Sequence, residues 1–430
     1  ERILQLKTLM IILRTVKNIS SLNIAASVLL FLAAILAAVV ANSSLSPVYQ
    51  DFLLQELHLR IGNFNLFSHG GHPLKMIEFI NDCLMTVFFL AVGLEIKREL
   101  LVGELSSVRK AALPFIAACG GMVVPVVIYA LSVASGTPET RGMAIPMATD
   151  IAFSLGVLSL LGKRVPLSLK IFLTAFAVVD DIGGILVIAL FYSADVAYGY
   201  LIAAAVLYVF LYYMGKFGVT QKIFFLFFGV IIWYLFLQSG IHSTISGVIL
   251  AFVIPARPRL DAGKYIERIR DIIGEFPVSK SDNIVLTNAQ IATLKQVERA
   301  SDYVISPLQS LEDNLHGAVS FVILPLFAFA NAGVVFSGSG SIVGDVSIAV
   351  AAGLLLGKFL GIYLFTWLAV KSGVALMPAG MNWKNIAGVS LLGGIGFTVS
   401  LFIANLSFAD EYPELLNLSL IHISEPTRPY

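Results

Sequence analysis

The stretch AVVDDIGGILVI, residues 177–188, places two adjacent aspartates, Asp180 and Asp181, inside an otherwise apolar run. The solvent around that run decides the fold class, and the composition of the chain identifies it. The chain has 430 residues, of which 58% are hydrophobic and 13% are charged, whereas about a quarter of the residues in a soluble domain are charged. The composition predicts an all-α polytopic membrane protein, in which charges within spanning helices are rare and costly.

A spanning helix needs about 20 mostly apolar residues. By that rule about eleven segments qualify, and we expect them to form one transporter domain over residues 1–406. The predicted segments are 24–41, 79–96, 111–134, 143–161, 167–191, 198–214, 223–237, 240–254, 318–335, 348–370 and 386–406.

Lys and Arg alternate between the two sides of these segments. One side receives cations before the first segment, after the second, fourth and sixth, and in the long charged piece 257–309, while the opposite connections hold few. Because cations favour the cytoplasmic side of a membrane, the amino terminus is predicted to be cytoplasmic. The net charge of +1 argues against nucleic acid as a partner, since phosphate binding needs a clustered basic surface.

Three pieces lie outside the apolar segments. Residues 48–68 alternate apolar and polar side chains, which predicts a small β-hairpin on the outer face. Residues 257–309 have helical periodicity in two parts, which predicts a pair of amphipathic cytoplasmic helices. The tail 407–430 ends in LIHISEPTRPY, which resembles the translation of a sequencing adapter, so we expect a truncated or artefactual end with one span missing.

Six ionisable residues lie within the apolar segments: Asp82, Asp150, Asp180, Asp181, His242 and Lys358. The isolated His242 is expected to be a hydrogen-bonded packing residue, and Asp82 lies near a segment end, where water reaches it. Asp180, Asp181 and Lys358 lie near the middle of their segments, where a charge is most costly. We therefore predict a functional role for these three. The two cysteines, Cys83 and Cys119, are expected to be unpaired core residues.

Two segments are predicted to break in mid-membrane. Pro146 removes a helical hydrogen bond just before Thr149 and Asp150, and Gly393, Gly394 and Gly396 occupy the corresponding place in the last segment. Interrupted segments in two halves of a chain are a sign of an inverted-repeat transporter with its site at the midplane. The sequence thus predicts two discontinuous helices.

These residues carry a resemblance to a known family. The run ATDIAFSLGVLSLLGKRVPLSLKIFLTAFAVVDDIGGILVIALFY resembles the core of the NhaA family of bacterial Na+/H+ antiporters, which has inverted repeats. The likeness continues in NDCLMTVFFLAVGLEIKREL, SGIHSTISGVILAFVIP, LPLFAFANAGV, LLLGKFLGIYLF and GGIGFTVSLFIA. It covers nearly the whole chain apart from the insert and both ends. The family normally has twelve spans, one more than the segments counted above.

The resemblance implies an electrogenic, pH-regulated antiporter in the bacterial inner membrane that expels Na+ or Li+ in exchange for H+. It implies an ion site, and hence the Na+ or Li+ ligands, at Asp180 and Asp181. Thr149 and Asp150 would lie at the broken-helix crossing, where Asp150 and Lys358 offset the partial charges of the helix ends. No cofactor is implied. The outer hairpin could pair edge to edge in a homodimer, as it does in relatives.

The resemblance also implies ionisable groups that sense pH at the cytoplasmic entrance. The matching positions are Glu95, Arg98, Glu99, Glu312 and His316. The chain departs from the better-known pattern at Asp313, where a histidine is usual. This difference predicts that pumping is retained while its pH range is shifted.

The chemistry of the residues, taken without the resemblance, also favours cation and proton exchange. Carboxylate oxygens are hard ligands that suit small hard cations, and a proton competes with the cation for the same oxygens. An aspartyl protease is disfavoured, because adjacent residues on one helix point about 100° apart rather than converging. A prenyltransferase is disfavoured because DDIGG lacks a repeated aspartate one turn on. We therefore expect no enzyme activity, and a sodium symporter for an organic solute remains the alternative.

Overall fold

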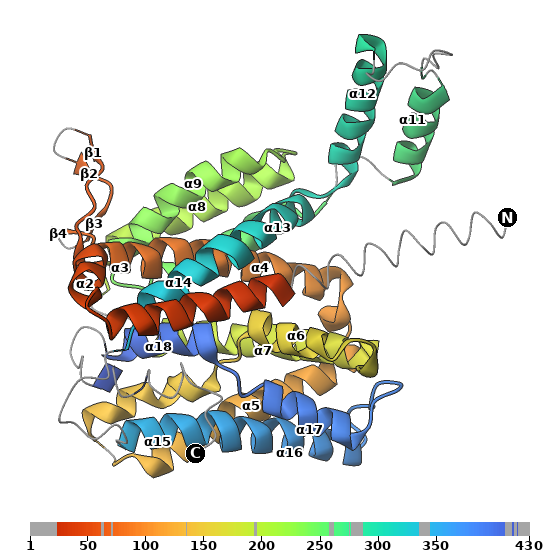
Figure 1. The fold of residues 1–430 in the computed structure, drawn as a ribbon. Helices are drawn as coiled ribbons and strands as arrows, with labels where there is room; N and C mark the ends of the chain where they lie inside the picture. The colour runs from red at the N-terminus through yellow and green to blue at the C-terminus, as the bar shows by residue number, and fades with distance from the viewer. Residues whose placement is uncertain are drawn as a thin grey trace.

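The structure is a computed structural model that describes residues 24–61, 64–69, 72–134, 136–192, 196–257, 262–274, 276, 287–334, 345–408, 415–416 and 419. Most of its helices run alongside one another in a single bundle, with a β-ribbon at one end and a helical pair, α11 and α12, standing away at the other (Figure 1). The predicted tail 407–430 lies outside the described residues apart from 407–408, 415–416 and 419.

Seven helices in the described ranges are long and apolar enough to cross a membrane. Three of them contain a π-helical turn, and they comprise α3 (Met76–Phe79), η1 (Ile80–Leu84) and α4 (Met85–Val102); α13 (Pro307–Ala318), η5 (Val319–Ile323) and α14 (Leu324–Asn331); and α15 (Asp345–Ala352), η6 (Gly353–Gly357) and α16 (Lys358–Lys371). The other four are Ile24–Ala41, α5 (Val108–Ser132), α7 (Leu167–Phe191) and α8 (Tyr198–Lys216).

Two further candidate spans are bent pairs. η3 (Pro138–Met147) and α6 (Ile151–Leu160) meet at 42°, and α17 (Trp383–Leu392) and α18 (Phe397–Phe408) meet at 43°. The apolar helices α9 (Lys222–Leu237) and α10 (Thr244–Val253) are shorter. Each of the eleven predicted segments overlaps one of these elements, so the prediction of an all-α polytopic membrane protein is confirmed.

The piece predicted as a hairpin over 48–68 differs in part from the prediction. Its first third lies in the helix α2 (Ser46–Leu54) rather than in a strand. Two short antiparallel ladders follow, β1 (Arg60–Ile61) with β2 (Phe64–Asn65) and β3 (Ser68–His69) with β4 (His72–Pro73). The hairpin therefore begins later than predicted, because Pro47 at the first helical turn favours helix at its start.

The charged insert folds as the predicted pair of helices. α11 (Ala262–Gly274) and α12 (Asn288–Val304) pack on each other. Tyr265, early in α11, and Ser301, late in α12, share a hydrogen bond of 2.9 Å between their hydroxyls. The two helices are therefore antiparallel. Short 3₁₀ turns at η2 (Glu104–Ser106) and η4 (Gly162–Arg164) complete the described helical elements.

Close packing between α5 and α16 fixes the part of the bundle that carries Lys358. Gly120 and Gly361 lie face to face, and a Cβ on either would meet the backbone carbonyl oxygen of the other. Gly357 lies as close to Pro125, since a Cβ there would be 2.6 Å from the Cα of Pro125. Small residues let two helix backbones approach in this way, and they leave α16 little room to shift.

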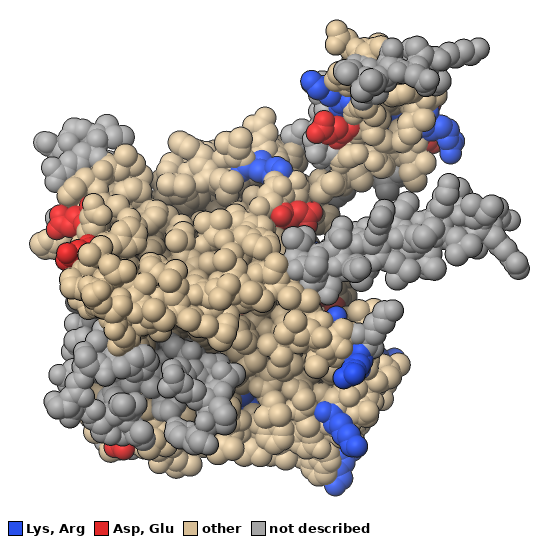
Figure 2. Space-filling model, viewed as in Figure 1, with Lys and Arg blue, Asp and Glu red and all other residues tan. Residues whose placement is uncertain are grey.

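The surface of the bundle is apolar along most of its length. On the visible face, charged side chains gather toward the ends of the helices, and the broad middle is almost free of them (Figure 2). Helix α8 is the most exposed of the long apolar helices described, because only 11% of its most apolar stretch is buried within the protein. Cys83 and Cys119 are unpaired, as predicted. Such a surface suits a hydrocarbon solvent rather than water.

Candidate functional site

The two broken helices touch at their breaks. The backbone N–H of Asp150 donates to the carbonyl of Ile395 at 2.7 Å, and the Thr149 hydroxyl donates to the carbonyl of Gly393 at 2.8 Å. Nearby, the Ser154 hydroxyl donates to the carbonyl of Leu392 at 2.9 Å. A helix break leaves carbonyls and N–H groups without intrahelical partners. Each broken helix here supplies the partners that the other lacks.

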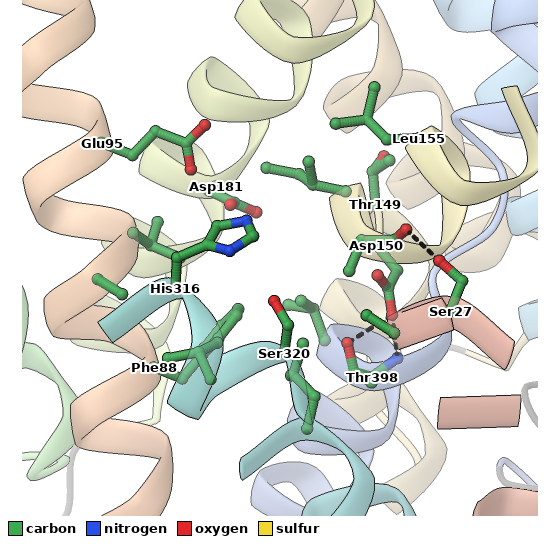
Figure 3. Close-up of a pocket in the computed structure, with 18 of the residues that line it drawn as sticks. Ser27, Phe88, Glu95, Thr149, Asp150, Leu155, Asp181, His316, Ser320 and Thr398 are labelled. Carbon is green, nitrogen blue, oxygen red and sulfur yellow. Dashed lines mark hydrogen bonds between the residues drawn. The ribbon is translucent and has the colours of Figure 1, made fainter. Parts of the chain in front are cut away.

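Asp150 caps the amino-terminal ends of α6 and α18 together. Its Oδ1 accepts from the N–H of Phe153 at 2.9 Å. Its Oδ2 accepts from the N–H of Thr398 at 3.1 Å and from the Thr398 hydroxyl at 2.6 Å (Figure 3). Helix amino termini carry a partial positive charge. One buried carboxylate thus lies between two such ends, in contact with both.

Lys358 contacts the crossing through Thr149, the residue before Asp150. Its ammonium donates to Oδ2 of Asp180 at 2.7 Å and to the Thr149 hydroxyl at 3.0 Å. Thr149 in turn donates to Gly393, one residue beyond the carboxyl end of α17. The side chain of Lys358 is fully buried and that of Asp180 is 1% exposed. The cation therefore pairs with one aspartate and is linked through a hydroxyl to a carboxyl-terminal helix end.

The two adjacent aspartates have different surroundings. Oδ1 of Asp180 is buried and has no hydrogen-bond partner among the described residues. Asp181 lines a cavity of about 310 Å³ that also reaches Asp150, Thr149 and Thr398 (Figure 3). Within the described part of the chain, Asp181 likewise accepts no hydrogen bond. Unsatisfied carboxylate oxygens at a buried cavity are uncommon and call for a ligand, a proton or water.

A second set of polar residues, called the entrance group, lines the same cavity at its more exposed end. Glu95, Arg98, Glu312 and His316 all face it. Nε of Arg98 lies 2.9 Å from Oε1 of Glu312, and Nη1 lies 3.0 Å from Oε1 of Glu99. Glu99 lies behind Arg98 and accepts from the N–H of Glu104 at 3.0 Å. All five positions singled out at the entrance therefore come together, from α4 on one side and α13 on the other.

Three hydroxyls at the site were not predicted as functional. Thr398 binds Asp150 directly, Ser27 donates to the carbonyl of Ala152 at 2.9 Å, and Ser320 lines the cavity (Figure 3). The place of Thr398 was open to inference, because it follows the glycines of the second break as Thr149 follows Pro146. Ser27 and Ser320 carried no such signal, since single serines are common in membrane helices.

His242 and Asp82 lie outside this cavity. Nδ1 of His242 is 3.1 Å from the Thr244 hydroxyl, and its Nε2 is 3.8 Å from Oδ1 of Asp82, which also accepts from the Ser243 hydroxyl at 3.2 Å. His242 is thus a hydrogen-bonded packing residue, as the sequence predicts.

Comparison with known proteins places this site in a family context. A family model described as Na+/H+ antiporter 1 matches residues 17–423. A Na+/H+ antiporter NhaA of Bacteroides thetaiotaomicron is 75% identical over 408 residues, which cover 95% of this chain and 93% of the relative. The NhaA of Bacteroides fragilis strain YCH46 is 74% identical over 418 residues, covering 97% and 96%. A protein of Saccharophagus degradans named Na+/H+ antiporter NhaA 1 is 43% identical over 393 residues, covering 90% and 83%.

Proposed function

Since the chain belongs to the Na+/H+ antiporter 1 family, we propose that it exchanges Na+ or Li+ for H+ by alternating access at Asp180 and Asp181. Family membership makes it a multi-pass membrane transporter rather than an enzyme. The observation that carries the site assignment is the pair of carboxylates themselves. Asp181 faces the cavity, and beside it Asp180 holds one oxygen that no described residue bonds.

The oxygens around this point suit the proposed cargo. Two carboxylates and the nearby Thr149 hydroxyl are hard donors, which favour small hard cations over soft metals. The sodium or lithium ion is cargo, so the site must release it as well as bind it. Ligands shared with a competing proton meet both needs, because each ligand oxygen holds either the cation or H+.

Competition between Na+ and H+ for the site produces exchange only if the empty site does not reorient across the membrane. The empty site holds the Lys358–Asp180 ion pair and, beside it, the uncompensated carboxylate of Asp181. Such a charge is costly to carry through a low-dielectric interior, whereas a site loaded with Na+ or with a proton is closer to neutral. Reorientation then favours the loaded forms. Lys358 adds a further coupling, because a cation that takes the oxygens of Asp180 weakens the 2.7 Å ion pair.

The crossing supports this proposal on electrostatic grounds. Asp150 lies against two amino-terminal helix ends, and Lys358 is linked through Thr149 to a carboxyl-terminal one. Opposite charges at helix ends are stabilising. We assign these two residues the role of compensating the broken helices, so that the aspartate pair is free to change its own charge.

We further propose that transport is electrogenic and is regulated by pH at the cavity entrance. Glu95, Arg98, Glu312 and His316 line the path toward Asp181, with Glu99 pairing Arg98 from behind. A proton taken up by one of the carboxylates or by His316 changes the charge that an entering cation meets, whereas Arg98 stays cationic throughout. We place the protein in the bacterial inner membrane with a cytoplasmic amino terminus, on the distribution of Lys and Arg. The β1–β4 ribbon offers strand edges for a homodimer.

The test uses everted membrane vesicles that hold a respiration-driven proton gradient. Addition of NaCl or LiCl is expected to collapse the gradient in vesicles that carry the unaltered protein. Asp180→Asn and Asp181→Asn are expected to abolish that response. Asp51→Asn is the matched control, because it makes the same change at an exposed aspartate on α2, away from the cavity. A normal response from both aspartate variants would overturn the site.

The same assay addresses the alternative of a sodium symporter for an organic solute. Such a transporter needs its solute before it moves Na+, and it carries no proton in return. An unaltered protein that leaves the gradient intact on addition of NaCl or LiCl, across the pH range tested, would overturn the antiport proposal itself.

A further inference from the structure

Three helices line the cavity and continue past it, away from the entrance group. On α4, α14 and α18 the lining residues go no farther in that direction than Phe88, Leu324 and Val399. About two turns beyond, or about 10 Å, each of these three spans carries an asparagine. The three are Asn81, Asn331 and Asn405. The cavity is therefore followed, on its far side, by three polar side chains inside the bundle.

The three carboxamides are hydrogen-bonded to one another. Nδ2 of Asn331 donates to Oδ1 of Asn81 at 2.8 Å, and Nδ2 of Asn81 donates back to Oδ1 of Asn331 at 3.2 Å. Nδ2 of Asn405 donates to the same Oδ1 of Asn331 at 2.9 Å. Asn331 is buried, and a buried amide is costly unless it is paired. These bonds therefore hold η1, α14 and α18 together at this level.

Aromatic side chains fill the space between the cavity and the amides. Phe402 follows the lining residues of α18 by one turn, and Phe327 does the same on α14, each on the face that carries the asparagine. The ring centre of Phe402 lies 6.2 Å from that of Phe327 and 5.6 Å from that of Phe89 on α4. All three rings are buried. The cavity is thus closed on this side by apolar rings first and by amides behind them.

Both layers lie across the boundary between the two walls of the cavity. One wall is formed by α4, η5 and α14, and the other by α6, α7 and α18. Helix α18 belongs to the second wall because it shares the cap Asp150 with α6. The bond from Asn405 to Asn331 and the ring contacts of Phe402 join the two walls, whereas the bonds between Asn81 and Asn331 lie within the first wall.

We propose that Asn405 and Asn331 form a latch, with Phe402 beneath it, that keeps the ion site closed to the face opposite the entrance group. This inference rests on the alternating access proposed above, because opening the site to that face requires the two walls to part there. Parting the walls breaks the amide bond and exposes Phe402, so the latch favours the orientation that is open at the entrance group. Amides do not titrate, so the bias is the same at every pH.

The test compares access to one reporter from the two faces of the membrane, and it does not depend on transport. The background variant is Cys83→Ala with Cys119→Ala, and Ser320→Cys adds a thiol that lines the cavity. A membrane-impermeant thiol reagent is added to right-side-out vesicles and to everted ones. Separate variants, Asn288→Cys on α12 and Asp51→Cys on α2, identify which face is exposed, because these helices lie at opposite ends of the bundle (Figure 1).

The measured quantity is the labelling rate from the far face divided by the rate from the entrance face. Asn405→Ala is expected to raise this ratio roughly three-fold, because it removes one hydrogen bond between spanning helices. Asn81→Ala is the matched control, since it keeps the bond from Asn405 to Asn331, and its ratio is expected to stay near that of the background. An unchanged ratio in Asn405→Ala, or an equal rise in Asn81→Ala, would overturn the latch.

A cross-link applies the opposite manipulation. Asn331→Cys with Asn405→Cys, in the cysteine-free background, is joined by a short, reducible bifunctional thiol reagent. The cross-link is expected to abolish the collapse of the proton gradient on addition of NaCl, and a reductant is expected to restore it. Exchange that continues in the cross-linked protein would overturn the latch and leave the antiport proposal standing. Failure of the antiport proposal is distinct, because the background variant would then leave the gradient intact before any cross-linking.

Discussion

Lys358 and Asp180 form an ion pair of 2.7 Å in which neither side chain has appreciable contact with the surface. The two residues come from α16 and α7, and the ammonium also lies 5.7 Å from the centre of the Phe176 ring. A pair of this kind is costly to break by removing one member, because the remaining charge is left buried and uncompensated. The pair therefore links stability directly to the residues proposed to carry the ion.

Lys358→Ala is expected to lower stability more than the double variant Lys358→Ala with Asp180→Asn. Breaking one side of a buried pair costs about 3–5 kcal/mol, and removing both charges recovers part of that cost. Thermal unfolding in detergent measures the difference, with Lys371→Ala as an exposed control. Equal losses in the single and the double variant would show that the pair contributes nothing beyond packing.

Asp150→Ala is expected to destabilise the crossing more than Thr398→Val. The first change removes the acceptor for two helix amino termini, at about 0.5–2 kcal/mol for each cap. The second keeps the N–H donor of residue 398 and removes only the hydroxyl. Unfolding temperatures in detergent rank the two variants. A larger loss in the threonine variant would contradict the shared capping of α6 and α18.

Gly361→Ala is expected to impair both stability and transport, because its Cβ would meet the carbonyl of Gly120 on α5. Overpacking costs about 1–3 kcal/mol, and the shift would be felt by Lys358, one turn away on α16. Gly388→Ala on α17 is the matched control, since nothing described lies within 4 Å of a Cβ there. Rates of proteolysis measure the loss of stability, and rates of Na+/H+ exchange measure the loss of transport. Similar rates for the two variants in both measurements would rule out a tight contact.

The apparent KM for Na+ is expected to fall as pH rises. If one proton competes with the cation for the site, the apparent KM changes roughly ten-fold per pH unit wherever the proton occupies the site. The sign follows from competition: fewer protons at higher pH leave more sites open to Na+. Initial rates of gradient collapse at several pH values give the slope. A KM independent of pH, with only the maximal rate changing, would argue against shared ligands.

Glu312→Ala and Glu99→Ala are expected to shift the pH profile of activity. Each removes a carboxylate that pairs with Arg98, so the entrance becomes more positive and the apparent KM for Na+ rises. Rates across pH in everted vesicles measure both effects. Glu298→Gln on α12 is the control for loss of a surface carboxylate. Profiles that match the unaltered protein in both variants would remove the entrance group as a pH sensor.

Sequence by itself was enough for the fold class, for the helical segments and for the family. Runs of about 20 apolar residues identify spans because the bilayer core admits few charges, and the family resemblance is confirmed by the matching family model over residues 17–423. The breaks were also predictable, since Pro146 and the glycines at 393, 394 and 396 disrupt helical hydrogen bonding locally. The helix α2 was missed, because a short amphipathic run fits either period.

Tertiary structure alone decided how these residues meet. No local pattern brings Lys358 within 2.7 Å of Asp180, or makes one carboxylate, Asp150, the cap of two helices whose amino ends are 246 residues apart in the chain. These contacts depend on close approach between α5 and α16 and on the crossing of the two broken helices. They are long-range packing results, so a sequence fixes the residue types while only the folded bundle sets their distances and their burial.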